Sequence, residues 1–304
     1  MFYIIVFLTF NKTNNPTNYL NLKNGVNIMK NSNITKIALL FFCFTLVINA
    51  SVFCQKDIIG QDVKIAANNP MGKTWVVFIE NSNYETFASL DGPVKDFNSI
   101  KMALANYQIH NIIHKKDMKK AQMERFFTIE LRDLVKQNQV KSLMVWYAGH
   151  GKFINDIGYW IPVDAKRDDE FTYFNINSLK AGLQGYNESV VHTLVVSDAS
   201  ESGPGFYTAM RSSNEAPACD NAIIAGSKSA QVFSSAGNEQ ASDNSKFTAT
   251  FANTLLNNRN PCIPIETIVK SVATAVAAES GQKPKFGKIQ GLEDRNGTFF
   301  FIAK

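Results

Sequence analysis

Three long apolar runs set the main constraint on how this chain can fold. They are Thr74–Glu80, Val140–Ala148 and Val190–Ser197, and each is about as long as one buried strand. Such runs are typical of strands that are covered on both faces, as in a parallel sheet. Segments 93–104 and 119–136, between the first two runs, carry apolar residues at helical spacing. The sequence therefore predicts an α/β fold, a three-layer αβα sandwich whose mostly parallel sheet of about six strands has helices on both faces.

The rest of the chain continues this alternation of strands and helices. A segment rich in Ser, Gly and Pro, 201–217, is expected to be a loop. Further strands are expected at 109–114, 158–163, 231–236 and 298–302, and further helices at 176–183, 245–256 and 264–278.

Two of the apolar runs end in turns that are built from small residues. The first turn, YAGHG, places His150 between two glycines, and the second, DASESG, presents Ser200. In open parallel sheets, binding and catalytic sites form outside the carboxyl ends of the strands. We therefore expect His150 and Ser200 to lie together at one edge of the sheet.

Several blocks of the chain occur in the order typical of the caspase and metacaspase peptidases. They are NSNYETFASLDGPVKD, YAGHG with GYWIPVDA, DASESG, QVFSSAGNEQAS, FTATFANTLL, and the closing KPKFGKIQG with GTFFFIA. One block alone would be a weak signal, but together and in this order they are specific. Over residues 73–304 the chain thus resembles a caspase-like domain. The resemblance implies the caspase-like sandwich and a cysteine-type endopeptidase activity on peptide or protein substrates.

The resemblance also implies roles for the residues of the two turns. His150 corresponds to the imidazole that accepts the nucleophile's proton and then protonates the leaving amine. The backbone N–H groups of Gly151 and Ser200 correspond to an oxyanion hole. Ser200 itself stands at the position where the family has its catalytic cysteine.

Two carboxylates match positions that line the first specificity pocket of metacaspases. They are Asp96 and Asp198, and a pair of acids there implies a preference for Arg or Lys, because a desolvated cation needs a charged partner. Caspases use basic residues in this pocket and select Asp. Two plainer interpretations remain open, in which Asp198 only caps its turn and Asp96 is a solvated helix residue.

A serine at the nucleophile position changes the expected chemistry. A cysteine thiol is readily ionised by a nearby imidazole, whereas a serine hydroxyl usually needs a histidine that a third group orients. No carboxylate is placed by motif to orient His150. We therefore expect a pseudopeptidase that binds peptides or partner proteins. A weak serine peptidase, or a working cysteine peptidase inactivated by substitution of its nucleophile, is the alternative.

A function from a different class is a doubly wound module that binds a nucleotide or a flavin. It would need a glycine-rich phosphate loop after the first strand, and none follows Thr74–Glu80. No cofactor is therefore expected. The net charge of +5 comes with scattered lysines, so nucleic-acid binding is not expected either.

The N-terminal region is typical of a targeting segment. A short basic stretch from Met29 precedes an apolar run at 37–50, which is short for a bilayer span and is followed by small residues suited to cleavage. We expect 1–54 to hold upstream sequence and a signal peptide, 55–72 a linker, and 73–304 the domain. The protein would then be secreted or periplasmic, with no stable membrane span in the mature chain, and an uncleaved N-terminal anchor is the alternative.

The cysteines and acidic residues of the domain give no clear metal or disulfide pattern. Cys219 and Cys262 fit no recognised framework, so two free buried thiols are favoured over a pair formed in an oxidising compartment. No Cys/His spacing suits zinc. The acidic run 168–170 is better explained as a solvated stretch than as a calcium site. No metal site is expected.

Overall fold

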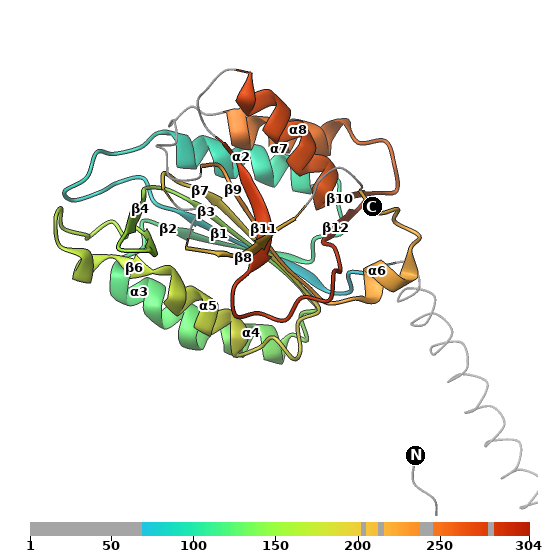
Figure 1. The fold of residues 1–304 in the computed structure, drawn as a ribbon, viewed down its shortest axis with the longest axis horizontal. Helices are drawn as coiled ribbons and strands as arrows, with labels where there is room; N and C mark the ends of the chain where they lie inside the picture. Colours follow the sequence, from blue (N-terminus) through green and yellow to red (C-terminus); the bar gives the residue numbers. More distant parts are fainter. Residues whose placement is uncertain (1–68, 202–204, 212–215, 237–245, 279–282) are drawn as a thin grey trace, which may run out of the picture. The chain divides into compact units, whose positions relative to one another are not determined.

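A seven-stranded sheet forms the centre of the fold, in the order β2-β1-β3-β7-β9-β11-β8 (Figure 1). The computed structural model describes residues 69–304 except 202–204, 212–215, 237–245 and 279–282. The first five strands pair in parallel, and β11 and β8 continue the sheet with antiparallel pairing. The bounds of the strands are β1 Thr74–Glu80, β2 Asn111–Lys116, β3 Ser142–Ala148, β7 His192–Asp198, β8 Tyr207–Met210, β9 Ser229–Ser234 and β11 Lys285–Ile289.

The predicted fold class is confirmed, with one strand more than the expected six. Strand β8 lies inside 201–217, where the sequence predicted a loop, so that prediction is wrong for Tyr207–Met210. Its residues become a strand by pairing with β11, and the Tyr207 hydroxyl donates to the carbonyl of Lys285 at 2.8 Å. A short strand inside a stretch rich in Ser, Gly and Pro is thus ordered by tertiary contacts.

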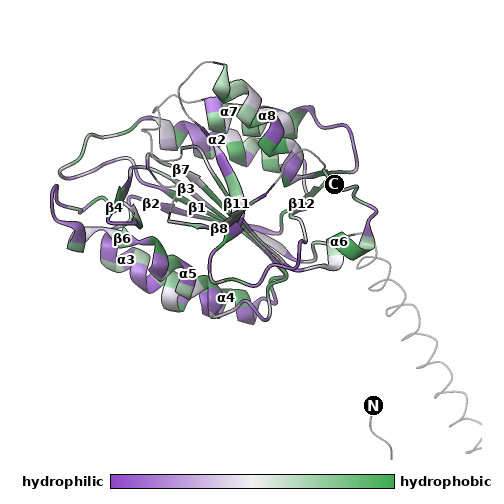
Figure 2. Ribbon diagram, in the orientation of Figure 1, coloured by the Kyte–Doolittle hydropathy of each residue, from purple (hydrophilic) through white to green (hydrophobic). Residues whose placement is uncertain are grey.

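Helices cover both faces of the sheet. One face carries α2 (Gly92–Leu104), α7 (Lys246–Asn257) and α8 (Ile265–Ala277) (Figure 1). The opposite face carries α3 (Lys120–Arg125), α4 (Leu131–Gln137) and α5 (Ile176–Gln184), with a π-turn at Phe126–Glu130 between α3 and α4. Figure 2 shows hydrophilic and hydrophobic residues alternating along α3, α4 and α5, as expected for helices with one face on a sheet.

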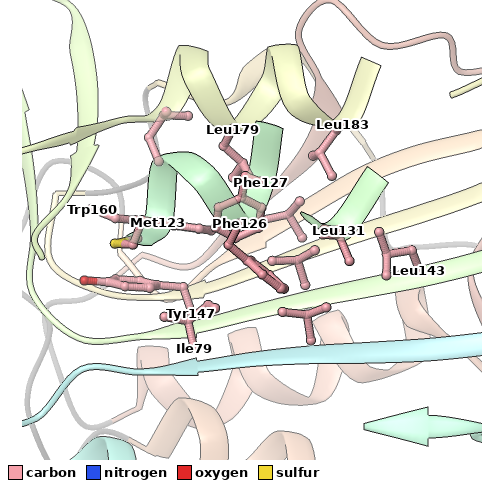
Figure 3. Packing of buried hydrophobic residues seen from close by; sticks show 14 of the residues in the cluster. Ile79, Met123, Phe126, Phe127, Leu131, Leu143, Tyr147, Trp160, Leu179 and Leu183 are labelled. Atoms are coloured by element: carbon pink, nitrogen blue, oxygen red, sulfur yellow. The ribbon is translucent and has the colours of Figure 1, made fainter. Parts of the chain in front are cut away.

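The apolar runs explain why the sheet is covered on both faces. Every residue of β1 and of β3 is buried. Successive side chains of a strand point to opposite faces, so Val77 and Ile79 join the core beneath α3, α4 and α5, while Val76 and Phe78 join the core beneath α2, α7 and α8. Figure 3 shows the first of these cores, in which Tyr147 reaches the edge of the cluster.

Two small sheets complete the domain. A three-stranded sheet contains β4 (Gly151–Ile154), β5 (Ile157–Trp160) and β6 (Phe174–Asn175), and it begins directly after β3. A two-stranded sheet pairs β10 (Cys262–Pro264) with β12 (Phe300–Ile302). Within the described residues, no helix is both long and apolar enough for a bilayer span, and the expected signal segment 37–50 lies outside them.

A disulfide joins Cys219 to Cys262, so the expectation of two free thiols is wrong. The Cα atoms lie 6.0 Å apart, and the bond ties the segment before α6 (Ala222–Gly226) to β10. Sequence spacing could not reveal this pairing, because 43 positions separate the two cysteines and only the folded chain brings them together.

Reducing this disulfide is expected to destabilise the domain. The bond closes a loop of 43 residues, for which loop-closure entropy predicts a loss of about 4 kcal/mol in the free energy of unfolding. Urea denaturation with and without a reductant measures the change. The Cys219→Ala/Cys262→Ala variant is the control, because reductant should not shift its midpoint. An unchanged midpoint for the reduced wild-type protein would contradict the prediction.

A buried histidine at the start of β7 couples stability to pH. His192 is fully buried, its Nε2 donates to the carbonyl of Ala225 at 2.9 Å, and its Nδ1 lies 2.9 Å from the Ser229 hydroxyl. Since a carbonyl only accepts, Nε2 carries the proton and Nδ1 accepts from the serine, so the ring is neutral. Burial lowers the pKa of His192 from 6.5 to about 4.

The domain is therefore expected to lose stability as the pH falls from about 6.5 towards 4. In that range the unfolded chain binds a proton at His192 that the folded chain does not, which costs about 2 kcal/mol at pH 5 relative to pH 8. Urea denaturation across this range measures the slope. A His192→Gln variant should show a shallower slope, and equal slopes in the two proteins would contradict the assignment.

Candidate functional site

The turns after β3 and β7 lie side by side at the carboxyl ends of the strands. The two strands pair in parallel up to Ala148 and Asp198, and the N–H of Gly149 donates to the carbonyl of Asp198 at 3.3 Å. Figure 1 shows β3 and β7 adjacent in the sheet, with β4 beside the end of β3. Because each turn starts at the same level of the sheet, His150 and Ser200 are brought to one edge.

Both glycines around His150 are required by close contacts. A Cβ at Gly151 would overlap with the carbonyl oxygen of Ser200 and would lie 3.1 Å from the Cβ of Ala199. A Cβ at Gly149 would lie 2.6 Å from the hydroxyl of Tyr84. The backbone of the histidine turn thus packs directly on the backbone of the serine turn.

A pocket of about 410 Å³ opens beside the two turns. It brings together three residues that the sequence predicted for the site, His150, Gly151 and Ser200. Neither Asp96 nor Asp198 is among the described residues that line it. The lining residues are Phe87, Ala88, His150, Gly151, Lys152, Arg167, Asp168, Tyr173, Ser200 and Glu201.

The loop after β1 holds the imidazole of His150. Nε2 lies 2.8 Å from the carbonyl oxygen of Ala88, and the rings of Tyr84 and Phe87 lie 4.6 and 5.7 Å from the imidazole, centroid to centroid. A carbonyl oxygen only accepts, so Nε2 carries a proton. In the neutral ring, Nδ1 is then the nitrogen that can act as a base.

Two tyrosine hydroxyls hold the main chain of His150. The N–H of His150 donates to the Tyr84 hydroxyl at 2.8 Å, and the Tyr147 hydroxyl donates to the carbonyl of His150 at 2.8 Å. Burial raises the pKa of both phenols above the ordinary value, so both remain protonated. The ring of Tyr147 stacks on Trp160 with centroids 4.4 Å apart, which links the histidine turn to the core.

Asp117 anchors the beginning of the loop that holds the imidazole. Its Oδ1 accepts from the N–H groups of Ser82 and Asn83, each at 2.9 Å. Burial alone would raise the pKa of Asp117, but the hydrogen bonds from Asn83 and Ser82 and the charge of Lys116 lower it below its ordinary value. The carboxylate therefore stays ionised and fixes the loop close to β1.

The predicted acid pair lies towards the face of the sheet that α2 and α7 cover. Side-chain alternation along β7 points Asp198 to that face, and Oδ2 of Asp198 accepts from the Thr248 hydroxyl of α7 at 2.7 Å. Asp96 lies in α2 and is half-buried. A third carboxylate, Glu80, occupies the same row of the sheet at the end of β1, where it lies 2.7 Å from Nε2 of His114.

Several residues of the site were missed by sequence reasoning. The Ala88 carbonyl is a backbone group, so no residue type signals its role. Tyr84 and Asp117 act only through the fold, because they lie far from His150 in the sequence. Glu80 carried a signal, since it is the one charged residue of an otherwise apolar run.

No cluster of three or more His, Cys, Asp or Glu side chains suited to a metal ion occurs among the residues that the structure describes. In the acidic run 168–170, Asp168 is exposed and has a left-handed backbone with φ of 61°. The exposure of Asp168 and its left-handed backbone are typical of a solvated turn.

Comparison with known proteins gives a family match and a structural match. The model of the caspase domain family matches residues 73–293. The structure is similar to the crystal structure of caspase-1 from Spodoptera frugiperda, with a TM-score of 0.50 and 13% identity, covering 73% of this chain and 93% of that chain. At this identity the likeness concerns the fold. Comparison with curated proteins finds no match.

Substituting Gly151 by alanine is expected to disturb the packing of the two turns. The added Cβ would overlap with the Ser200 carbonyl, and relief by backbone movement is expected to cost about 1–3 kcal/mol of unfolding free energy. Urea denaturation measures the loss. Gly226→Ala is the matched control, because its Cβ would meet nothing within 4 Å. Equal stability of the two variants would show that the turns are not in close contact.

Proposed function

The chain belongs to the caspase domain family, whose members are of the cysteine peptidase kind, and we propose that this chain is a pseudopeptidase of that family. It would keep the family's binding site for a peptide and lack most of the family's covalent chemistry. The observation that carries the proposal is that Ser200 and His150 line one pocket. By the resemblance of its turn, Ser200 corresponds to the family's nucleophile.

The surroundings of His150 support this proposal over an active serine peptidase. To take a proton from a serine hydroxyl, an imidazole needs a partner that stabilises its charged form, as a carboxylate does in serine peptidases. Nε2 lies 2.8 Å from the Ala88 carbonyl oxygen, which orients the ring but carries no charge. A thiol ionises far more easily, so the same histidine would be sufficient for a cysteine.

We propose further that the peptide carries Arg or Lys before the position of cleavage. Three carboxylates support this preference. Asp198 points towards the face of the sheet that α2 and α7 cover, and Asp96 lies in α2. Glu80 occupies the same row of the sheet as Asp198. A side chain that enters between these elements would meet carboxylates, which favour a cation in a site from which water is excluded.

The variant Ser200→Cys is expected to gain hydrolysis of an Arg-ended fluorogenic peptide, by about a thousandfold or more over the chain with Ser200. An Asp-ended peptide should remain uncut. Adding His150→Ala to the variant should abolish the gain, since the thiol then loses its base. Turnover by the serine form would favour the serine-peptidase alternative, and an inactive but folded Ser200→Cys variant would contradict a preserved site.

The role of the acid pair, Asp96 and Asp198, is tested in the Ser200→Cys variant. Adding Asp198→Asn keeps the acceptor for Thr248 but removes the charge, and we expect kcat/KM for the Arg-ended peptide to fall by about 10- to 100-fold. Asp133→Asn is the matched control, because Asp133 lies on α4 with a half-exposed side chain and an Arg132 partner. Equal losses in the two variants would contradict a specific role for Asp198.

A further inference from the structure

The pocket beside His150 holds two cationic side chains that the proposed chemistry does not use. They are Lys152 of β4 and Arg167 of the loop after β5, and both line the pocket. In the described part of the chain, neither forms an ion pair with a carboxylate. The pocket also holds two acids, Asp168 and Glu201, so the charges must be considered one by one.

Arg167 is held in place with one edge of its guanidinium engaged. Nε donates to the carbonyl of Thr86 at 2.8 Å, and the guanidinium carbon lies 5.8 Å from the centroid of the Phe87 ring. These contacts use the edge at Nε and one face of the group. The two terminal nitrogens form the opposite end of the guanidinium, which is the end that binds a carboxylate with two parallel hydrogen bonds.

The two acids of the pocket balance the formal charge of the two cations, but in the described part of the chain neither acid forms an ion pair with them. The Oε2 atom of Glu201 accepts from the N–H of Phe153 at 3.2 Å, so this carboxylate is turned to the main chain of β4. Asp168 lies in an exposed left-handed turn directly after Arg167. The pocket therefore contains two cations whose charged groups are not paired with its own acids.

The pocket lies on the side of Ser200 where the leaving part of a substrate belongs. In the family chemistry the imidazole protonates the departing amine, so the chain beyond the scissile bond has to pass on the imidazole side of the nucleophile. The pocket contains His150 together with Phe87 and Ala88, the residues that hold the imidazole. Asp198 points the other way, towards Thr248 of α7.

We propose that this pocket is a subsite for an acidic residue, Asp or Glu, that follows the scissile position of the bound peptide. The inference rests on the proposed function and specifies its substrate class, a peptide with a basic residue followed closely by an acidic one. The carboxylate pairs with the free end of Arg167 and with the ammonium of Lys152. Phe87 and Tyr173, whose ring centroids lie 6.0 Å apart, form an aromatic wall beside it.

The chain with Ser200 allows a direct binding test, because it is expected to hold a peptide without cutting it. Fluorescein-labelled decapeptides would carry one Arg, followed one, two or three positions later by Asp, and the matched peptides would carry Asn or Lys there. Fluorescence anisotropy at low salt should show about tenfold tighter binding for the best Asp peptide than for its Asn counterpart. The difference should shrink in 0.5 M salt, as charge pairing at a partly open site is screened.

Variants of the two cations decide whether the pocket is responsible. Arg167→Gln and Lys152→Gln should each reduce the preference for Asp over Asn at least threefold, while binding of the Asn peptide stays within twofold. Lys166→Gln is the matched control, because Lys166 is an exposed neighbour of Arg167 outside the lining of the pocket. Lys152 lies in a strand away from the loop that holds His150, so its variant tests the pocket even if Arg167→Gln disturbs that loop.

The two proposals fail in different ways. If Ser200→Cys cleaves the Arg-ended peptide but Asp and Asn peptides bind equally, the acidic subsite is wrong and the pseudopeptidase proposal stands. A preference for Asp that survives both cation variants would also overturn the subsite. If no peptide binds and Ser200→Cys is inactive, both proposals are overturned.

Discussion

The parallel pairing of β3 with β7 is the constraint on which the rest of the site depends. It sets Ala148 level with Asp198, so two turns that are far apart in the sequence leave the sheet at one place. The turns then pack so closely that Gly151 has no room for a side chain against Ser200. A shift of register by one residue would turn the side chains of β7 to opposite faces and would also separate the two turns. The geometry of the site is therefore a consequence of core packing, which fixes that register.

The imidazole depends on a second, separate set of contacts. The loop after β1 supplies the Ala88 carbonyl and the Tyr84 hydroxyl, and Asp117 pins the start of that loop. The Ala88 carbonyl that holds Nε2 is a neutral group, so in the proposed function the identity of the nucleophile becomes decisive. A neutral partner can orient a base for a thiol, but it gives little help to the charged imidazolium that a serine reaction requires. In the proposed function, an oxygen in place of the family's sulfur would thus be enough to separate binding from catalysis.

The fold could be predicted from the sequence because its central strands are apolar along their whole length. That pattern can be read from neighbouring residues alone, and in the structure every residue of β1 and β3 is buried. The features that were missed are non-local. Strand β8 exists because β11 offers a partner, and the disulfide exists because the fold brings Cys219 to Cys262. The role of the Ala88 carbonyl could not be predicted at all, since every residue has that group.

The arrangement of charged side chains around the two turns bears on the direction in which a bound peptide would run. Asp198 and Asp96 lie towards the α2 and α7 face, whereas the pocket on the side of the imidazole holds Lys152 and Arg167 together with Asp168 and Glu201. A peptide with a basic residue before an acidic one matches both charges in the direction that presents its bond to His150. The reversed order of charges would match only if the peptide ran backwards, and its carbonyl would then be turned away from the oxyanion donors. In the proposed function, complementary charge therefore selects the orientation of the peptide as well as its composition.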